Sequence, residues 1–239
     1  MTAFSRLADP AHPAIRRLAA LAPLDPSARA ALADAALRSR ALRPARELLA
    51  EGAPIANPLL ILSGWAARVR FLTDGRRQIM SLLLPGDLIG NCRHSRPLSV
   101  SSIVALSPLT VCAAPSPGSP SLEEAYHVSH ALDEAYLLAQ ITRLGRFSAE
   151  ERVVDLMLEL RDRLTLCGLV SDGGFAWPLT QSALADTLGL TPVHVNRTLQ
   201  QLRRRGEVVL RAGRLQLTDP AELIHRVGHI TAHVTATQS

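Results

Sequence analysis

One segment, from Leu179 to Gly206, restricts the fold of this 239-residue chain more than any other. Thr180 is of the residue type that caps a short helix, and Gly189 supplies the left-handed residue of a tight turn. Thr191 and Pro192 have the form of the cap and first residue of a second helix. Two short helices joined by such a turn make a helix-turn-helix, so the sequence predicts this motif here.

The second of these helices has one apolar side and one polar side. Val195, Leu199 and Leu202 are separated by four and three residues, so they lie on one stripe of the helix. The opposite side and the start of the helix offer groups that can reach base edges in a major groove of DNA. The candidate DNA-binding residues of the motif are Thr180, Gln181, Ser182, Thr191, Val193, His194, Asn196, Arg197, Gln200 and Arg204.

The chain beyond the second helix predicts a wing, because two short apolar runs flank an Ala212–Gly213 turn. Arg211 and Arg214 border this turn and complete the candidate DNA-binding set. No acid occurs from Thr187 to Gly206, whereas Arg203 to Arg205 are consecutive, so the region is a basic patch suited to a polyanion. The alternative is an ordinary helical hairpin whose arginines are only solvated.

The first half of the chain has a different pattern of apolar and turn-forming residues. From Arg43 to Ala114, short apolar runs alternate with turn signals about ten residues apart, which predicts a compact antiparallel sandwich or barrel. The segment from Ala66 to Ser81 predicts a hairpin around its Asp74–Gly75 turn. Ahead of this region we expect a helical lead-in, in which Asp25 opens a short helix that ends near Leu37.

A long helix is predicted between these halves. Residues from Ser121 to Leu144 include no proline or glycine, and apolar residues recur at alternating spacings of three and four. Such a seam pairs two copies of a chain in a homodimer, or else packs the helix on its own β-domain. Gly145 breaks the pattern, and Ser148 with Glu151 forms a capping box for the next helix. The candidate dimer residues are Ala125, Val128, Leu132, Ala135 and Ala139.

The chain resembles the Crp/Fnr family of bacterial transcription regulators over nearly its whole length. LSGW at 62–65, DGRRQI at 74–79 and LPGDLIG at 84–90 look like the jelly-roll sensor domain of that family, and LTPVHVNR at 190–197 looks like its recognition helix. The resemblance implies an α+β protein. Residues 1–120 would form the helical lead-in and a cyclic-nucleotide-binding-like β-roll, 121–147 the dimerisation helix and hinge, and 148–239 a winged helix-turn-helix domain.

The same resemblance implies a function. It predicts a homodimer that binds a near-palindromic operator in double-stranded DNA through the 191–205 helix and contacts RNA polymerase. Arg197 falls where the family's recognition-helix arginine reads guanine. Pro192 and Val193 replace the arginine and glutamate of the cyclic-AMP-responsive branch. We therefore expect an operator different from that of the cyclic-AMP-responsive branch.

The sensor region departs from the family pattern in its ligand residues. A glutamate that holds the ribose and an Arg-Ser pair that neutralises the cyclic phosphate are replaced here by Asn91 and by Val100–Ser101. A phosphate without its arginine loses a charge-assisted hydrogen bond, so we expect no response to cyclic nucleotides. The cysteine cluster of the oxygen-sensing branch is also missing, because no cysteine precedes Cys92.

Cys92 and His94 are candidate sensor residues, since thiolate and imidazole both bind haem and a low-pKa thiol is redox-sensitive. A haem, redox or small-molecule sensor with weak or lost DNA binding is therefore the alternative function. The simpler expectation is that Cys92 is a packed side chain, that His94 is a loop residue and that the protein has no cofactor.

Other function classes have less support. The motifs of acyl-transfer, phosphate-binding, zinc-protease and paired-carboxylate sites are missing, which argues against an enzyme. Three cysteines without C-x-x-C spacing argue against a disulfide framework. Apolar runs are far shorter than the roughly 20 residues of a membrane span, so we expect a cytoplasmic protein without membrane contact. His225, His229 and His233 could bind a metal if the tail is helical, and otherwise form a solvated or frayed end.

Overall fold

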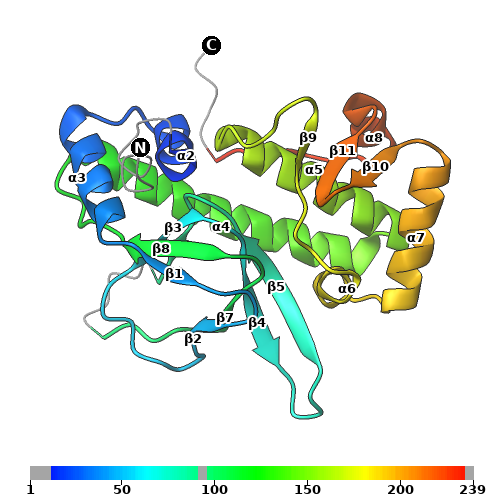
Figure 1. The fold of residues 1–239 in the computed structure, drawn as a ribbon, viewed down its shortest axis with the longest axis horizontal. Coiled ribbons are helices and arrows are strands. Elements are labelled where there is room, and N and C mark those ends of the chain that lie inside the picture. The colour runs from blue at the N-terminus through cyan, green and yellow to red at the C-terminus, as the bar shows by residue number, and fades with distance from the viewer. Residues whose placement is uncertain (1–11, 91–95, 235–239) are drawn as a thin grey trace.

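A β-roll and a helical C-terminal half make up the computed structural model, which describes residues 12–90 and 96–234 (Figure 1). Helices α2 (Pro13–Leu21) and α3 (Pro26–Leu37) come first, and Asp25 caps α3 as expected. The strands that follow are β1 (Arg40–Leu42), β2 (Glu47–Leu49), β3 (Leu59–Ser63), β4 (Ala66–Phe71), β5 (Arg77–Leu83), β6 (Leu88–Ile89), β7 (Ser102–Ala105) and β8 (Leu109–Ala113).

These strands form two four-stranded sheets, in the orders β1-β8-β3-β6 and β2-β7-β4-β5, with antiparallel pairing throughout. Buried residues of both sheets, such as Ile61 and Ile103, form one cluster between them. The predicted antiparallel sandwich is confirmed. The β4–β5 hairpin is also confirmed, with Phe71 opposite Arg77 and Gly75 at a φ of +85° in the turn.

Helix α4 (Pro120–Arg146) is the predicted long helix, and α5 (Ala149–Leu166) follows it with the predicted capping box at Ser148. The five predicted dimer residues differ in exposure within a single chain. Ala125 and Leu132 are 0% and 5% exposed because they pack inside their own chain, so they offer no surface to a second copy. Val128, Ala135 and Ala139 are only partly exposed. Ala125 and Leu132 thus fit the alternative interpretation, in which α4 packs within its own chain, and the seam as a whole stays a prediction.

The C-terminal half contains β9 (Gly174–Ala176), α6 (Gln181–Leu188), α7 (Pro192–Arg204), β10 (Val208–Arg211), β11 (Arg214–Leu217) and α8 (Pro220–Val227). The predicted helix-turn-helix and wing are confirmed. Sequence reasoning missed β9, which adds a third strand to the wing in the order β10-β11-β9. A three-residue strand that includes a glycine leaves almost no periodic pattern to recognise.

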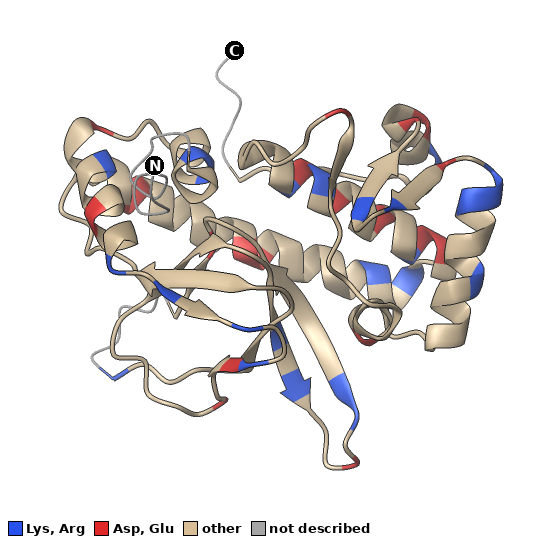
Figure 2. Ribbon diagram, viewed as in Figure 1, with Lys and Arg blue, Asp and Glu red and all other residues tan. Residues whose placement is uncertain are grey.

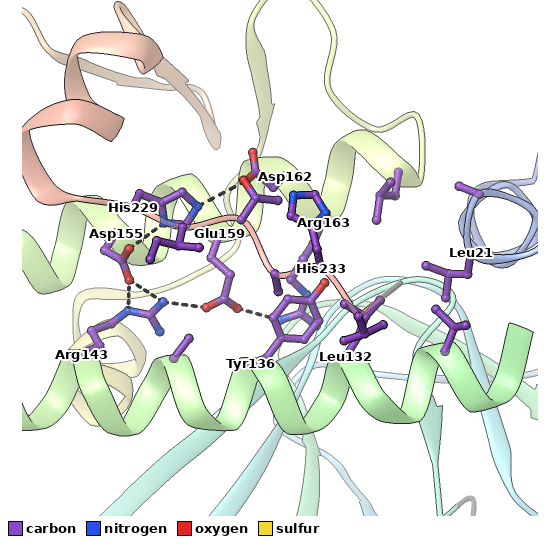
Figure 3. Close-up of a pocket in the computed structure, with 18 residues that line it drawn as sticks. Leu21, Leu132, Tyr136, Arg143, Asp155, Glu159, Asp162, Arg163, His229 and His233 are labelled. Carbon is purple, nitrogen blue, oxygen red and sulfur yellow. Dashed lines mark hydrogen bonds and ion pairs between the residues drawn. The ribbon is translucent and has the colours of Figure 1, made fainter. Parts of the chain in front are cut away.

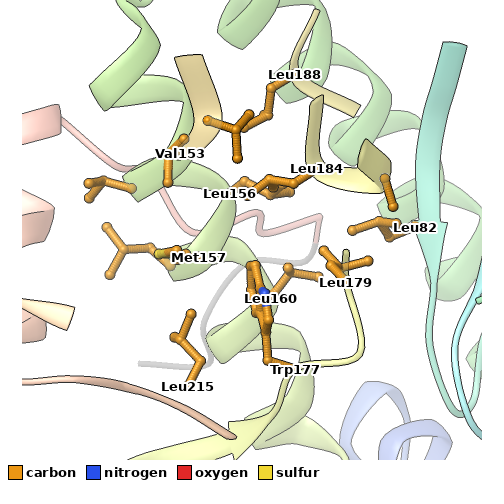
Figure 4. Packing of buried hydrophobic residues seen from close by; sticks show 14 of the residues in the cluster. Leu82, Val153, Leu156, Met157, Leu160, Trp177, Leu179, Leu184, Leu188 and Leu215 are labelled. Atoms are coloured by element: carbon orange, nitrogen blue, oxygen red, sulfur yellow. The ribbon is translucent and has the colours of Figure 1, made fainter. Parts of the chain in front are cut away.

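One hydrophobic core joins the two halves of the molecule. Leu156 and Leu160 of α5 are fully or nearly buried, and they belong to the same cluster as Leu199 of α7 and Trp177 beyond β9. Leu82 of β5 in the β-roll belongs to this cluster too, and Figure 4 shows it facing Leu179. The helix-turn-helix is therefore packed against the β-roll, in addition to being joined to it by α4.

The C-terminal histidines do not fit the helical metal site, and His229 also departs from the solvated alternative that His225 and His233 fit. Helix α8 ends at Val227, and Gly228 continues the chain with a φ of +64°, so the three histidines do not share one helical face. The described residues contain no cluster of histidine, cysteine or carboxylate groups that could hold a metal ion. His225 is exposed, but the His229 side chain is only 5% exposed and is bound by two aspartates. Within the described ranges, no helix is long and apolar enough to cross a membrane.

Candidate nucleic-acid interface

The helix pair α6 and α7 is built by local caps. Thr180 accepts a hydrogen bond from the Ala183 N–H at 3.1 Å, and Thr191 accepts one from the His194 N–H at 3.2 Å. Between the helices, Gly189 has a φ of +62°, a left-handed conformation that favours glycine. These contacts fix the angle between the two helices.

Helix α7 presents a polar face to solvent. Val195, Leu199 and Leu202 are 0–3% exposed, so they hold the helix against the core. On the other side Val193 is 71% exposed, and Arg197, Gln200 and Arg204 are exposed with it. The structure thus brings these predicted residues together on one open surface, with Thr191 and His194 exposed at its N-terminal end.

Asn196 connects the two helices instead of standing free. Its Oδ1 accepts from the Gln181 side-chain amide at 3.3 Å and lies 3.5 Å from that of Gln200. Gln181 and its neighbours Thr180 and Ser182, all exposed, begin α6 beside this contact. The amides therefore form a polar group that spans both helices.

The basic patch is smaller than the sequence indicates. Arg197, Arg203 and Arg204 make no ion pair with any described residue and are exposed along α7, where Figure 2 shows the blue bands. Arg205 differs, because it contacts Glu150 at 2.7 Å and Glu207 at 2.8 Å. Hydrogen bonding from Arg226 and then Arg205 lowers the pKa of Glu207 to about 2, so this carboxylate is charged at neutral pH.

In the wing, the two predicted arginines have different roles. Arg214 Nη2 donates to the carbonyl oxygens of Ser171 and Gly174, both at 3.0 Å, and to the Ser171 hydroxyl at 2.9 Å. This guanidinium thus holds the loop before β9 in place. Arg211 is exposed and has no such partner among the described residues, so it is the wing arginine free to meet a phosphate.

The β-roll makes direct polar contacts with α6, the first helix of the pair. Arg77 Nε of β5 lies 2.6 Å from Asp186 Oδ2 of α6, and Gln78 donates to the Asp186 carbonyl at 2.7 Å. From α4, Gln140 donates to the Thr187 carbonyl at 2.6 Å. These residues were missed from the sequence, because their partners lie about fifty or a hundred positions away and no local pattern marks them.

A chain of alternating charges runs between the two halves of the molecule, and Figure 3 shows its part from Arg163 to Asp162. Each member contacts the next at 2.6 to 3.3 Å, and cations and anions alternate strictly along it. We call this set the charge chain; in order its members are Arg17, Asp87, Arg163, Glu159, Arg143, Asp155, His229 and Asp162.

Pairing keeps the charge chain ionised despite its burial. Burial alone would raise the pKa of Asp87, but the Arg17 and Arg163 guanidinium groups bring that pKa below its usual value. Burial alone would lower the pKa of His229, but hydrogen bonds to Asp155 and Asp162 raise it to about 9. The imidazole is therefore a cation at neutral pH.

The sensor half contains a cavity of about 490 Å³ between the β-roll and α4. Its described arginines are already paired: Arg68 with Asp133 at 3.1 Å, and Arg163 with Asp87 at 2.7 Å. Val100 is 73% exposed at the rim of this cavity, and Ser101 is buried beside it. The predicted positions Asn91, Cys92 and His94 lie outside the described residues.

Comparison with known proteins identifies both halves. Residues 39–118 match the model of the cyclic nucleotide-binding domain, and residues 151–226 match that of the Crp-like helix-turn-helix domain. The nitrogen fixation regulation protein FixK of Bradyrhizobium diazoefficiens is 34% identical over 173 residues, which cover 68% of this chain and 70% of that protein. The chain belongs to the Crp/Fnr family.

Other relatives of this Crp/Fnr protein agree. The transcriptional activator protein FnrL of Cereibacter sphaeroides is 31% identical, over 70% of this chain and 71% of its own length. The solved structure of FixK2 from Bradyrhizobium japonicum superposes with a TM-score of 0.68 at 25% identity, covering 82% of this chain and 98% of that one. Our Crp/Fnr protein is thus a DNA-binding transcription regulator with the α+β architecture predicted from its sequence.

Proposed function

We propose that this regulator works as a homodimer that places α7 of each subunit in the major groove of a near-palindromic operator. The observation that carries the proposal is the open face of α7, where Arg197 and Arg204 are exposed and unpaired above a fully buried apolar stripe. A free guanidinium can form a bidentate contact with guanine, and one recognition helix per subunit matches a two-fold operator. By family analogy, we also propose contact with RNA polymerase.

The dimer face that we propose lies on the outer side of α4. Leu138 and Ile141 are 58% and 66% exposed, and Leu137 beside them is 39% exposed. Leu138 and Ile141 are three residues apart and so share one face of the helix. Apolar side chains grouped on an exposed helix face favour association with a second copy, which would bury them. We propose this face in addition to the partly exposed residues of the predicted seam.

We further propose a cytoplasmic, non-enzymatic protein without a cofactor. Its relatives are named as regulators and activators of transcription. Burial raises the pKa of the Cys112 and Cys167 thiols to about 11 and about 12, so neither is a reactive thiolate. Haem binding at Cys92 and His94 is the alternative, and a Soret band in protein from haem-replete cells that is lost in Cys92→Ser would favour it.

Selection of bound duplexes from a random DNA pool tests the proposal and gives the operator at once. We expect the full-length protein to enrich a two-fold symmetric motif whose half-sites lie about one helical turn apart. Light scattering should show a dimer both free and on the selected duplex. Failure to enrich any motif, or enrichment of a single asymmetric site by a monomer, would contradict the proposal.

A further inference from the structure

A second cavity, of about 210 Å³, lies between α2, α4, α5 and the segment that follows α8. Figure 3 shows Leu21 approaching it from α2 and Leu132 and Tyr136 from α4, with His229 and His233 of the C-terminal segment opposite. It is separate from the open face of α7, and it differs from the β-roll cavity although Tyr136 and Arg163 border both. Its walls come from the sensor side, from the DNA-binding side and from the tail.

The apolar part of this cavity has the size and lining to hold a single six-membered ring. Leu21, Val128, Leu132, Ala139 and Leu166 form its apolar walls. An engineered apolar cavity of about 150 Å³ in another protein stays dry and binds benzene, so about 210 Å³ admits a single six-membered ring with a small substituent.

The charged groups around the cavity exclude a charged occupant. Arg143, Asp155, Glu159, Asp162, Arg163 and His229 all line it, and each is held in the charge chain by an oppositely charged neighbour. An anion or cation entering here would have to break one of these pairs or remain buried without a partner. Both carry a large free-energy cost, so the occupant should be uncharged.

The Tyr136 side chain brings a polar group to the wall of this cavity. Tyr136 is 8% exposed, and its ring lies 4.3 Å from the Arg163 guanidinium carbon. Among residues 12–90 and 96–234, the side-chain contact found for Tyr136 is this one with Arg163, and its hydroxyl has no hydrogen-bond partner there. Tyr136 lines the cavity, and Figure 3 places its ring between α4 and His233 of the tail. The hydroxyl is not one of the fully buried unpaired atoms of the described residues, so it is accessible and can pair with a ligand atom or with water.

We propose that this cavity is a binding site for an uncharged, single-ring compound with one hydrogen-bonding substituent, which pairs with the Tyr136 hydroxyl. The proposal does not depend on DNA binding, because it rests only on the cavity, the paired charges and the free hydroxyl. A compound bound here touches α4, α5 and the tail together, so it also stabilises their present arrangement.

Four probes of nearly equal size test separately whether the site needs a hydrogen-bonding substituent and whether it excludes charge. We would titrate the full-length protein with benzyl alcohol, toluene, benzoate and benzylamine, following binding by ligand-observed NMR and calorimetry. Benzyl alcohol should bind best. Toluene, which cannot pair with the hydroxyl, should bind about fivefold more weakly. Benzoate and protonated benzylamine should bind at least about tenfold more weakly than benzyl alcohol.

Two variants assign the binding to this cavity. Tyr136→Phe keeps the ring against Arg163 but removes the hydroxyl, so benzyl alcohol should fall to the affinity of toluene while toluene is unchanged. Ala139→Leu fills the cavity and should abolish binding of both, whereas Ala221→Leu, exposed on α8, should not. If Tyr136 had only a structural role, Tyr136→Phe would change the affinities for benzyl alcohol and toluene by the same factor.

The proposal is overturned if none of the four probes binds, or if the charged probes bind as tightly as benzyl alcohol. It is equally overturned if a folded Ala139→Leu variant, checked by circular dichroism, binds benzyl alcohol like the unmodified protein. If Ala139→Leu does not fold, the selective loss in Tyr136→Phe decides. DNA binding is measured separately, so its presence or absence leaves this outcome unaffected.

Discussion

His229 and Asp155 are in contact at 2.6 Å between imidazole Nδ1 and carboxylate Oδ1, although 74 residues separate them in the sequence. The other oxygen of the same carboxylate is held by Arg143 at 2.7 Å. Asp162 takes the second imidazole nitrogen at 3.3 Å and also accepts from the Thr231 hydroxyl at 2.7 Å. The segment after α8 is therefore held on α5 by His229 and Thr231.

This contact predicts a pH-dependent stability. The pKa of His229 rises from 6.5 to about 9 on folding, so the stabilisation is full below pH 6.5 and is lost as pH rises through about 9. At neutral pH it amounts to about 2–3 kcal/mol. Urea unfolding of the unmodified protein should show this decline, and His229→Gln should be less stable and lack it. His225→Gln on exposed α8 is the matched control; an equal slope in His229→Gln would contradict the prediction.

Asp87 is the most deeply buried acid of the charge chain. It is 0% exposed, contacts Arg17 and Arg163, and accepts from the Leu84 N–H at 2.7 Å. Asp87→Ala leaves two buried arginines without a counter-charge, so it should cost about 3–5 kcal/mol of unfolding free energy. Asp74→Ala in the exposed β4–β5 turn should change stability little. Denaturant unfolding of both variants checks this, and comparable stability would argue against the charge chain as a structural link.

The sequence predicted the parts of the fold that local signals specify. Thr180, Gly189 and Thr191 determine where two helices begin and end, and they do so through contacts within four residues. The same holds for Gly75 in the hairpin turn. Such signals act through the backbone and are readable in any chain, which is why the helix-turn-helix, the wing and the long helix were all predicted.

Contacts between distant residues were not predictable in this way. The spacing of Leu132 fits a dimer seam and an internal packing face equally well, and only the positions of α2 and α5 decide between them. His229 has the spacing of a helical metal ligand, but Gly228 ends the helix one residue earlier. Arg205 and Arg214 look like their neighbours in sequence, yet both are held by partners outside the motif.

Two substitutions on α4 should separate association from folding. Ile141 is 66% exposed, so Ile141→Glu should leave the subunit folded while placing a charge in the proposed dimer face. We expect light scattering to show a folded monomer. Leu132 is 5% exposed, so Leu132→Glu should instead unfold the subunit, with loss of helical circular dichroism. A dimeric Ile141→Glu variant would exclude this face as the interface.

Three arginines should differ in their effect on DNA binding. Arg197→Ala should cost about 1–3 kcal/mol on the selected operator and relax one base position per half-site. Arg211→Ala should weaken binding to every duplex and flatten the salt dependence. Arg205→Ala is the control, because its guanidinium is already taken by Glu150 and Glu207. Fluorescence anisotropy at several salt concentrations measures these affinities. If Arg197→Ala selects the same DNA motif as the unmodified protein, the proposed position of α7 in the major groove is wrong.

Cyclic AMP and cyclic GMP should not bind in the β-roll cavity, because its described lining lacks a free cation for the phosphate and not because it is too small. The β-roll cavity of about 490 Å³ is roomy, but Arg68 and Arg163 are both paired already, and Asp133 and Glu134 also line the wall. Burial and the negative charge of Asp87 raise the pKa of Asp133, although nearby arginines act in the opposite direction. A cyclic phosphate placed here would lose its water without gaining a cation. Titration calorimetry should detect no binding, Val100→Arg should raise the affinity, and micromolar binding by the unmodified protein would contradict the prediction.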